Sequence, residues 1–186
     1  VLLGKQGAGK GTQGARLARH FDTQHLSTGQ LFRDSAAAGV SAGLEAKGYM
    51  DRGELVPDEI VVAVVEERFA NPREVEGGFV LDGYPRTETQ AVALERVLGN
   101  QPLDLVINLE VPTELVVERM EARGREDDTA ESIRRRLELY ETETKPLVDF
   151  YLERKLLVVV DGVGEEGEVW LRLLAAVDAR FDPVSA

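Results

Sequence analysis

Short apolar runs alternate along this chain with longer segments whose apolar residues recur at helical spacing. The runs lie at residues 1–3, 25–27, 78–83, 105–109 and 156–160. Alternation of short strands with helical segments is typical of a parallel sheet whose strands are connected by helices. The pattern therefore predicts an α/β fold in which a five-stranded parallel sheet is flanked by helices.

The helical segments are marked by their apolar faces and by the residues at their ends. In the first segment, one helical face carries Gly14, Leu17, Ala18 and Phe21. In the last, core contacts are expected from Trp170, Leu171, Leu173 and Leu174. Pro146 lies in a long helical stretch capped by Thr129, and it is expected to bend or restart that stretch. Further helices are expected over residues 30–38, 39–53, 57–69, 87–98, 112–123 and 165–180.

Between the first run and the first helix lies a glycine-rich loop, Gly4-Lys5-Gln6-Gly7-Ala8-Gly9-Lys10-Gly11-Thr12. Glycines permit backbone conformations in which successive N–H groups point inward around a phosphate, and the positive end of the following helix adds to that field. Lys10 is placed to reach the outer phosphates of a nucleoside triphosphate. A glycine-rich turn with a chance lysine is the alternative, but the flanking strand and helix favour a phosphate-binding loop (P-loop).

The chain is acidic, with 34 Asp and Glu residues against 22 Lys and Arg and a formal net charge of -12. Such a chain repels nucleic acids and anionic membranes, so we expect neither as a partner. To hold a phosphate-rich ligand, it has to concentrate positive charge locally. Arg119 and Arg123 share a helix face, and Arg125 and Arg136 flank the next helix start. The arginines at 134–136 point about 100° apart, so at least one should be a solvated surface charge. For any single arginine of this group, a surface ion pair is the simpler interpretation.

The composition excludes several classes of protein. Cysteine is absent, which excludes disulfides, thiol catalysis and cysteine metal sites. No stretch approaches the roughly 20 apolar residues that a membrane helix needs, and no signal-peptide pattern is visible. We therefore expect a cytoplasmic protein, and a monomer because no exposed apolar stripe is evident. Since the chain begins without Met and inside its first strand, we also expect further residues before Val1.

An acid and a glycine follow two of the predicted strands, as Asp82-Gly83 and as Asp161-Gly162. Ligands of parallel sheets bind beyond the carboxyl ends of the strands, where the P-loop also lies. Asp82 should face that crevice, where an acid can hold Mg²⁺ or its waters beside phosphates, although an ordinary turn is the alternative. Gly11 follows the loop lysine, where a Ser or Thr usually touches Mg²⁺. Nucleotide oxygens and water are therefore expected to supply most of the metal's ligands.

Taken in order along the chain, several motifs resemble those of bacterial adenylate kinases. They are Gly4-x-x-Gly7-Ala8-Gly9-Lys10-Gly11-Thr12-Gln13, Leu26-Ser27-Thr28-Gly29, Gly53-Glu54-Leu55-Val56-Pro57-Asp58, Leu81-Asp82-Gly83-Tyr84-Pro85-Arg86-Thr87 and Arg123-Gly124-Arg125-x-Asp127-Asp128. The resemblance covers essentially the whole chain and implies reversible transfer of a phosphoryl group from Mg-ATP to AMP, which gives two ADP. It implies a P-loop NTPase core formed by residues 1–26, 57–121 and 129–186, a small helical AMP-binding insert at 27–56 and an abbreviated lid at 122–128.

The resemblance also implies roles for individual residues. ATP is expected to bind at Gly7, Ala8, Gly9, Lys10, Gly11, Thr12, Arg119, Arg123 and, by its backbone near the adenine, Gly164. AMP is expected to bind at Thr28, Arg33, Glu54, Leu55, Val56, Gly83, Tyr84, Pro85, Arg86, Gln90, Arg125 and Arg136. The catalytic group is expected to consist of Lys10, Arg86, Arg119, Arg123, Arg125 and Arg136. Mg²⁺ is expected to be held through water by Asp82.

The chain departs from the family's pattern in three places. The long lid of many bacterial members is missing, since Gly124 alone separates the two arginines of the last motif, so no structural zinc is expected. Lys5 and Gln6 replace the small residue and the proline usual in the loop, which adds a charge beside the phosphates and removes a backbone restraint. Gln30 stands where the family usually carries an acid.

Two other functions stay open at this point. A kinase for UMP or CMP would resemble this chain, although Thr28 favours AMP because the pyrimidine relatives usually have Ala at that position. A catalytically weak nucleotide-binding or sensing protein is compatible with Lys5, Gln6 and Gln30. A GTPase is poorly supported, because no Asn-Lys-x-Asp guanine motif occurs.

Overall fold

The computed structural model describes residues 1–71 and 75–181 and confirms the parallel five-stranded sheet. Its strands are β1 (Leu2–Leu3), β2 (Gln24–Ser27), β3 (Phe79–Asp82), β4 (Val106–Glu110) and β5 (Leu157–Asp161). They lie in the order β2-β3-β1-β4-β5, and every neighbouring pair is parallel. The chain thus leaves the central β1 toward one edge and later returns to its other side. A crevice is expected at the carboxyl end of β1, where the loops on its two sides diverge.

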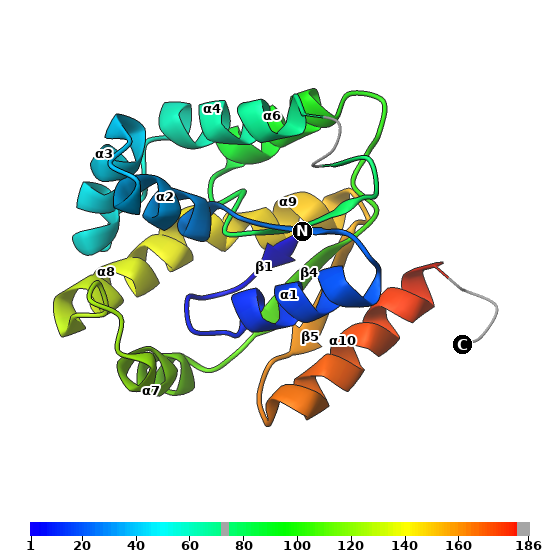
Figure 1. Cartoon of the computed structure of the whole chain (residues 1–186). Coiled ribbons are helices and arrows are strands. Elements are labelled where there is room, and N and C mark those ends of the chain that lie inside the picture. The colour runs from blue at the N-terminus through cyan, green and yellow to red at the C-terminus, as the bar shows by residue number, and fades with distance from the viewer. Residues whose placement is uncertain (72–74, 182–186) are drawn as a thin grey trace.

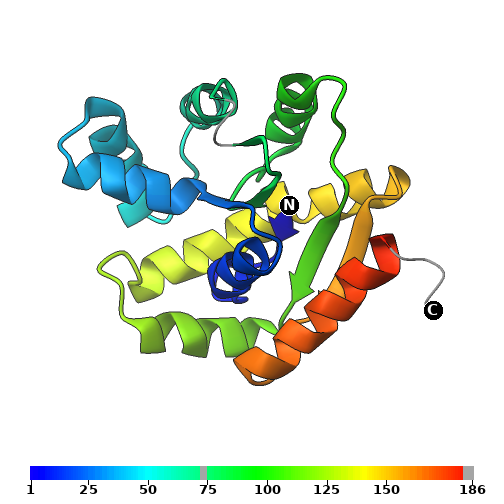
Figure 2. The same ribbon diagram turned by 45° about the vertical axis from the view of Figure 1, so that its right-hand side comes forward.

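Helices connect the strands and cover both faces of the sheet. They are α1 (Lys10–His20), α2 (Thr28–Ala37), α3 (Ser41–Asp51), α4 (Asp58–Phe69), α6 (Glu88–Leu98), α7 (Thr113–Arg123), α8 (Ala130–Leu139), α9 (Pro146–Glu153) and α10 (Glu166–Phe181). Figures 1 and 2 show α1 and α10 on one face of the sheet and α4, α6 and α9 on the other. The pair α2 and α3, which lies within the insert predicted at residues 27–56, packs together and projects beyond the sheet.

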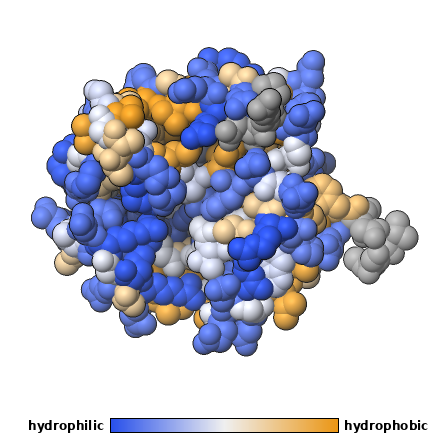
Figure 3. All heavy atoms as spheres, in the orientation of Figure 1, coloured by the Kyte–Doolittle hydropathy of each residue, from blue (hydrophilic) through white to orange (hydrophobic). Residues whose placement is uncertain are grey.

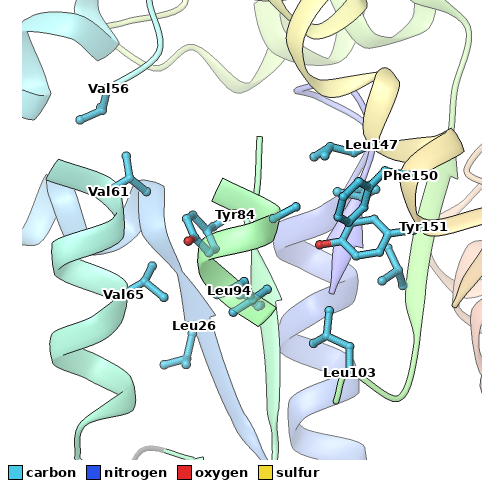
Figure 4. Close-up of a cluster of buried hydrophobic side chains, with 14 of the residues drawn as sticks. Leu26, Val56, Val61, Val65, Tyr84, Leu94, Leu103, Leu147, Phe150 and Tyr151 are labelled. Atoms are coloured by element: carbon cyan, nitrogen blue, oxygen red, sulfur yellow. The ribbon is translucent and has the colours of Figure 1, made fainter. Parts of the chain in front are cut away.

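Two apolar clusters hold these layers together, one on each face of the sheet. On the face of α4, α6 and α9, Tyr84, Leu94 and Leu147 are completely buried. Figure 4 shows Val61 and Val65 of α4 facing this cluster from one side, with the α9 residues on the other. The second cluster packs α1, α7 and α10 against the sheet through a set that includes Leu17, Val116 and Leu173. The space beyond the carboxyl ends of the strands is left free for a ligand.

Two residues are exposed, one that the pattern placed on the apolar face of the first helix and one that was expected in the core. Phe21 is 44% exposed because α1 ends at His20, so Phe21 caps the helix rather than continuing its buried face. Leu171 is 66% exposed because the buried face of α10 is formed by Val169, Leu173 and Val177. Those three residues follow the spacing of four that keeps side chains on one side of a helix.

The long helical stretch after Thr129 is interrupted, as the proline in it predicts. The interruption is a π-helical turn, η1 (Tyr140–Thr144), in which the N–H of Lys145 donates to the carbonyl of Tyr140 at 2.8 Å. Pro146 has no N–H to continue the normal helical pattern, and α9 begins at this residue. The chain between α8 and α9 is therefore wider than an ideal helix.

Of the helices described, none combines the length and the apolar character needed to cross a bilayer. On the face seen in Figure 3, hydrophilic residues predominate and apolar ones form small groups between them.

The core packing predicts unequal effects of two truncations on the same helix, α6. Leu94 is completely buried, whereas Val92 is 47% exposed. Leu94→Ala should lower the free energy of unfolding by about 3 kcal/mol through lost burial and the cavity left behind, whereas Val92→Ala should change it by less than about 0.5 kcal/mol. Urea unfolding of both variants measures the difference. Equal losses would mean that α6 does not pack as described.

Candidate active site

Two hollows open beyond the carboxyl ends of the strands, and they meet there. The loop hollow is lined by the glycine-rich loop, the end of β3, α7 and the start of α10. The insert hollow is lined by α2, the segment after α3, the start of α6 and η1. A shared border belongs to both hollows and consists of Gln6, Lys10, Gly29, Arg33, Gly83 and Arg86. Ligands that fill the two hollows would therefore touch at a border that carries three cationic side chains.

The loop between β1 and α1 approaches its neighbours so closely that side chains are excluded at two positions. Gly4 has φ +134°, and a Cβ there would lie 2.6 Å from the carbonyl oxygen of Leu109. Gly7 has φ +86°, and a Cβ there would lie 2.7 Å from the carbonyl oxygen of Val116 on α7. These contacts seat the loop against β4 and α7. Its other side faces the loop hollow.

The start of α1 is prepared for an anion. Its N-cap residue, Gly9, has no side chain to satisfy the first N–H groups, and the first turn holds no acidic residue. The unpaired N–H groups and the helix dipole together favour a negatively charged ligand at this point. Gly11 and Thr12 of this first turn line the loop hollow.

At the border of the two hollows, Lys10 folds back onto its own loop. Its ammonium donates to the carbonyl oxygens of Gly4 at 2.7 Å and of Lys5 at 2.8 Å. Burial lowers the pKa of Lys10 to about 8, with Arg86 and Arg123 adding to the effect and Asp82 opposing it. An anion entering the border between the hollows would favour the charged form of this lysine.

Asp82 ends β3, lines the loop hollow and interacts electrostatically with Lys10 and Arg86 of this border. Its side chain is 8% exposed, and the hydroxyl of Ser27 reaches it at 3.5 Å. A Cβ on Gly11 would lie 3.5 Å from the carboxylate of Asp82, so the carboxylate sits beside the first turn of α1. One carboxylate next to a phosphate cradle matches the way Mg²⁺ is often held, by few protein ligands together with phosphate oxygens and water.

Asp127 and Asp128 hold two of the arginines. Asp128 is paired with Arg123 at 2.5 Å and with Arg136 at 2.7 Å, and Arg136 is also paired with Asp127. Arg136 is 9% exposed and donates in addition to the carbonyl of Met50 at the end of α3. Burial alone would raise the pKa of Asp128, but the contacts with Arg123 and Arg136 hold it below its usual value. The short turn after α7 is thereby tied both to α8 and to the insert.

The remaining arginines stand close together, and neighbouring acids offset their repulsion only in part. Arg86 donates to the carbonyl of Gly83, and its pKa is lowered by burial and by the neighbouring Arg136 and Arg33, with Asp82 acting in the opposite direction. Burial also lowers the pKa of Arg125, and Arg123 and Arg33 add to that effect. Mutually repelling cations of this kind create a field that an anion would relieve.

Arg33 is oriented by a neutral partner. Its guanidinium donates to the side-chain oxygen of Gln30 at 3.1 and 3.4 Å, and the amide group of Gln30 donates to Asp34 at 2.7 Å. Because Gln30 carries no charge, it holds Arg33 without neutralising it.

The wall of the insert hollow is fixed by a polar network. Thr28 is 3% exposed and donates to the carbonyl of Gly83 at 3.0 Å. Gln90 is 1% exposed, accepts from the backbone N–H of Arg86 at 2.8 Å and donates to Asp58 at 2.7 Å. Both side chains are thus held in place before any ligand arrives.

Most residues predicted for the site line one of the hollows. The loop hollow holds Gly7, Ala8, Gly9, Lys10, Gly11, Thr12, Asp82, Arg119, Arg123 and Gly164. The insert hollow holds Thr28, Arg33, Glu54, Leu55, Val56, Gly83, Pro85, Arg86, Gln90 and Arg136. Arg125 lines the loop hollow, although the resemblance assigned it to the AMP side. Tyr84 lines neither hollow, because it is buried in the core with its hydroxyl donating to the carbonyl of Gln90.

Some residues that organise the site were not assigned by the sequence reasoning. Asp58, Asp127 and Asp128 position Gln90, Arg123 and Arg136, as described above. All three acids lie within the motifs that carry the family resemblance, so the motifs held the signal without the reason for it. The side chain of Lys5 was expected beside the phosphates, but it lines neither hollow and donates instead to Thr113 at 2.7 Å.

Comparison with known proteins gives a consistent result. The family model "Adenylate kinase" matches residues 2–156. The chain is 49% identical over 185 residues to an adenylate kinase of Stenotrophomonas maltophilia (strain K279a), an alignment that covers 96% of this chain and 98% of the relative. It is 51% identical over 179 residues to an adenylate kinase of Nocardia farcinica (strain IFM 10152), covering 95% of this chain and 97% of the relative.

The ion pairs of Asp128 predict a pH-dependent contribution to stability. Because the pKa of Asp128 is lowered in the folded state, its contribution is present above the ordinary Asp pKa and is lost as the pH falls through the folded value. Asp128→Asn should lower the free energy of unfolding by about 2 kcal/mol at neutral pH, and the difference from wild type should shrink below about pH 4. Urea unfolding at several pH values measures this.

A matched control for that experiment is Glu138→Gln. Glu138 forms an exposed pair with Arg134 on α8, so its removal should change stability by less than about 0.5 kcal/mol. If the loss of unfolding free energy in Asp128→Asn stays constant from neutral to acid pH, the role given to the ionised form of Asp128 is contradicted.

Proposed function

Since the chain belongs to the adenylate kinase family, we propose that the loop hollow binds Mg-ATP and the insert hollow binds AMP, with their phosphates meeting at the shared border. The reaction is the reversible transfer of the terminal phosphoryl group of ATP to AMP, which gives two ADP. The observation that carries the assignment of the two hollows is that Lys10, Arg33 and Arg86 line both of them. Positive charge is therefore concentrated where the phosphoryl group has to pass.

On the donor side, the backbone of the loop and the start of α1 hold the ATP phosphates. Lys10 leaves the loop carbonyls and donates to the transferring group. Arg119 and Arg123 lie on the same face of α7 and stabilise the negative charge on that group. Fixed donors of this kind act on the barrier because the charge on the phosphate oxygens develops within their reach. Gly164 offers its backbone to the adenine of ATP.

On the acceptor side, Arg86 is the group that both orients AMP and contacts the phosphoryl group that is transferred. It is half-buried, lines both hollows and has no carboxylate hydrogen-bond partner among the described residues. Arg33 and Arg136 line the same hollow and hold the AMP phosphate with it. The base of AMP lies against Thr28, Leu55, Val56 and Gln90, a set that also lines the insert hollow.

Mg²⁺ fits the donor side of the border. Asp82 would hold it through water, and the metal would neutralise charge on the ATP phosphates during transfer. No group of three or more acidic, His or Cys side chains able to hold a metal occurs among the described residues, so Asp82 stands as a single carboxylate. This arrangement suits a cation that arrives with its nucleotide.

Phosphoryl transfer to AMP rather than to water needs a closed site. We assign closure to the insert at 27–56, together with the short segment at 122–128, because the carbonyl of Met50 and both acids of that segment hold the same Arg136. A monomeric state and a cytoplasmic location stay predictions.

The first test follows the reaction by phosphorus NMR, with Mg-ATP and either AMP, UMP or CMP. ADP should form rapidly with AMP and much more slowly with the pyrimidine nucleotides. Lys10→Met should lower turnover at least ~100-fold, the scale of one lost transition-state donor.

In the wild type, kcat/KM for ATP should fall as the pH rises through about 8, because Lys10 of the enzyme without bound nucleotide then loses its charge.

Turnover with UMP or CMP at the rate seen with AMP would return the pyrimidine kinase alternative. Nucleotide binding without turnover would support the sensing alternative. Activity of Lys10→Met within about threefold of wild type would remove the lysine from the mechanism.

A second test separates the two substrates. Arg86→Ala should raise the KM for AMP about tenfold or more and that for ATP much less, because a charged hydrogen bond to the acceptor phosphate is lost. Steady-state kinetics with each nucleotide varied in turn measures both constants. Arg96→Ala, an exposed change on α6, serves as the control. Equal rises in both KM values would show that Arg86 does not belong to the acceptor side.

A further inference from the structure

The side chain of Lys5 connects the P-loop to two segments that lie far away in sequence. Its ammonium donates to the hydroxyl of Thr113 at 2.7 Å, at the first residue of α7. It also lies 3.8 Å from the carboxylate of Glu141 in the π-helical turn η1. The Lys5 side chain is 18% exposed and that of Glu141 is 45% exposed, so the link is shielded from solvent on the side of the lysine.

The two segments that Lys5 reaches carry groups of the transfer machinery. Helix α7 bears Arg119 and Arg123 nearer its other end. In η1, the hydroxyl of Thr144 donates to the carbonyl of Arg86 at 2.9 Å. The side chain of Lys5 thus connects the P-loop to the helix that carries Arg119 and Arg123. It also connects the loop to the turn that holds the backbone of Arg86.

The backbone of Lys5 is part of the same arrangement. Its carbonyl accepts from the ammonium of Lys10 at 2.8 Å and from the N–H of Ala8 at 3.1 Å. A shift of residue 5 would therefore move the acceptor on which Lys10 rests. The side-chain anchors and the lysine of the P-loop act on the same peptide unit.

Glu141 is itself held from a second side. Lys145 donates to it at 2.5 Å, and this contact, followed by the weaker one from Lys5, lowers the pKa of Glu141. Glu141 is therefore ionised at neutral pH and acts as a fixed anchor for Lys5. The pair of Lys145 and Glu141 does not involve the side chain of Lys5.

We propose that Lys5 is a positioning residue for phosphoryl transfer. Its side chain fixes the P-loop against α7 and η1 and does not touch either nucleotide. The proposal rests on the function proposed above. A lysine that attracted phosphates would line a hollow and would act mainly on nucleotide affinity. A lysine that sets the distance between loop and arginines acts on the rate of transfer, because small misplacements of reacting groups are costly.

The test compares Lys5→Met, Glu141→Gln and the double variant, after turnover of the wild type with Mg-ATP and AMP has been established. Lys5→Met should lower kcat about tenfold and leave the KM values for ATP and AMP within about threefold. Glu141→Gln should lower kcat about threefold, and the double variant should be no slower than Lys5→Met by more than about 1.5-fold, because both changes break one link.

A matched control is Glu95→Gln. Glu95 is paired with Arg154 at 2.8 Å between α6 and α9, and neither residue lines a hollow. This change should leave kcat within about 1.5-fold of wild type, although it too removes an ion pair between two segments. If Lys5→Met does not fold, as judged by thermal melting, Thr113→Val tests the same link. It removes the 2.7 Å hydrogen bond alone and should lower kcat about threefold at unchanged KM.

Several results would overturn the proposal. They are a kcat of the folded Lys5→Met variant within about twofold of wild type, a larger change in either KM than in kcat, and effects of Lys5→Met and Glu141→Gln that multiply. A loss of kcat in Glu95→Gln as large as that in Glu141→Gln would show that any lost ion pair slows the enzyme. Absence of turnover in the wild type would refute the proposed function instead.

Discussion

The structure depends on keeping positive charges together in a protein whose formal net charge is -12. Burial, and to a lesser extent repulsion between the like charges at the border of the two hollows, lowers the pKa values of Lys10 and Arg86. The fold resists this repulsion by seating the P-loop against α7 and by pairing Arg123 and Arg136 with Asp127 and Asp128. The charge that these acids leave uncompensated is available to phosphates. The resting state thus presents a cationic border at which we propose that phosphate-rich ligands bind.

The parallel sheet converts that cluster of charge into a site for transfer. Because β1 is central, the P-loop and the end of β3 meet at one point, with the insert on one side and α7 on the other. Two ligands can approach this point from opposite hollows. In the proposed arrangement their phosphates share the same cations, so the group that moves does not have to leave the field that stabilises it.

The sequence predicted the sheet and the P-loop because both leave strong local signals, namely apolar runs and a spacing of glycines. It failed where a tertiary contact decides the outcome. Phe21 and Leu171 fit the helical pattern, but the end of α1 and the orientation of α10 expose them. Lys5 was expected beside the phosphates because it lies in the loop, yet Thr113 and Glu141, which attract it elsewhere, are more than 100 residues away in sequence. The acids that pair with the arginines lie within a motif, but their role as partners could not be recognised from the sequence.

The central claim is that two nucleotides bind end to end, one in each hollow. Calorimetric titration of AMP into protein already saturated with Mg²⁺ and a non-hydrolysable ATP analogue tests it most directly. The account predicts that about one AMP binds per chain without displacing the analogue, as separate hollows with a common border require. Competition between AMP and the analogue for a single site would contradict it.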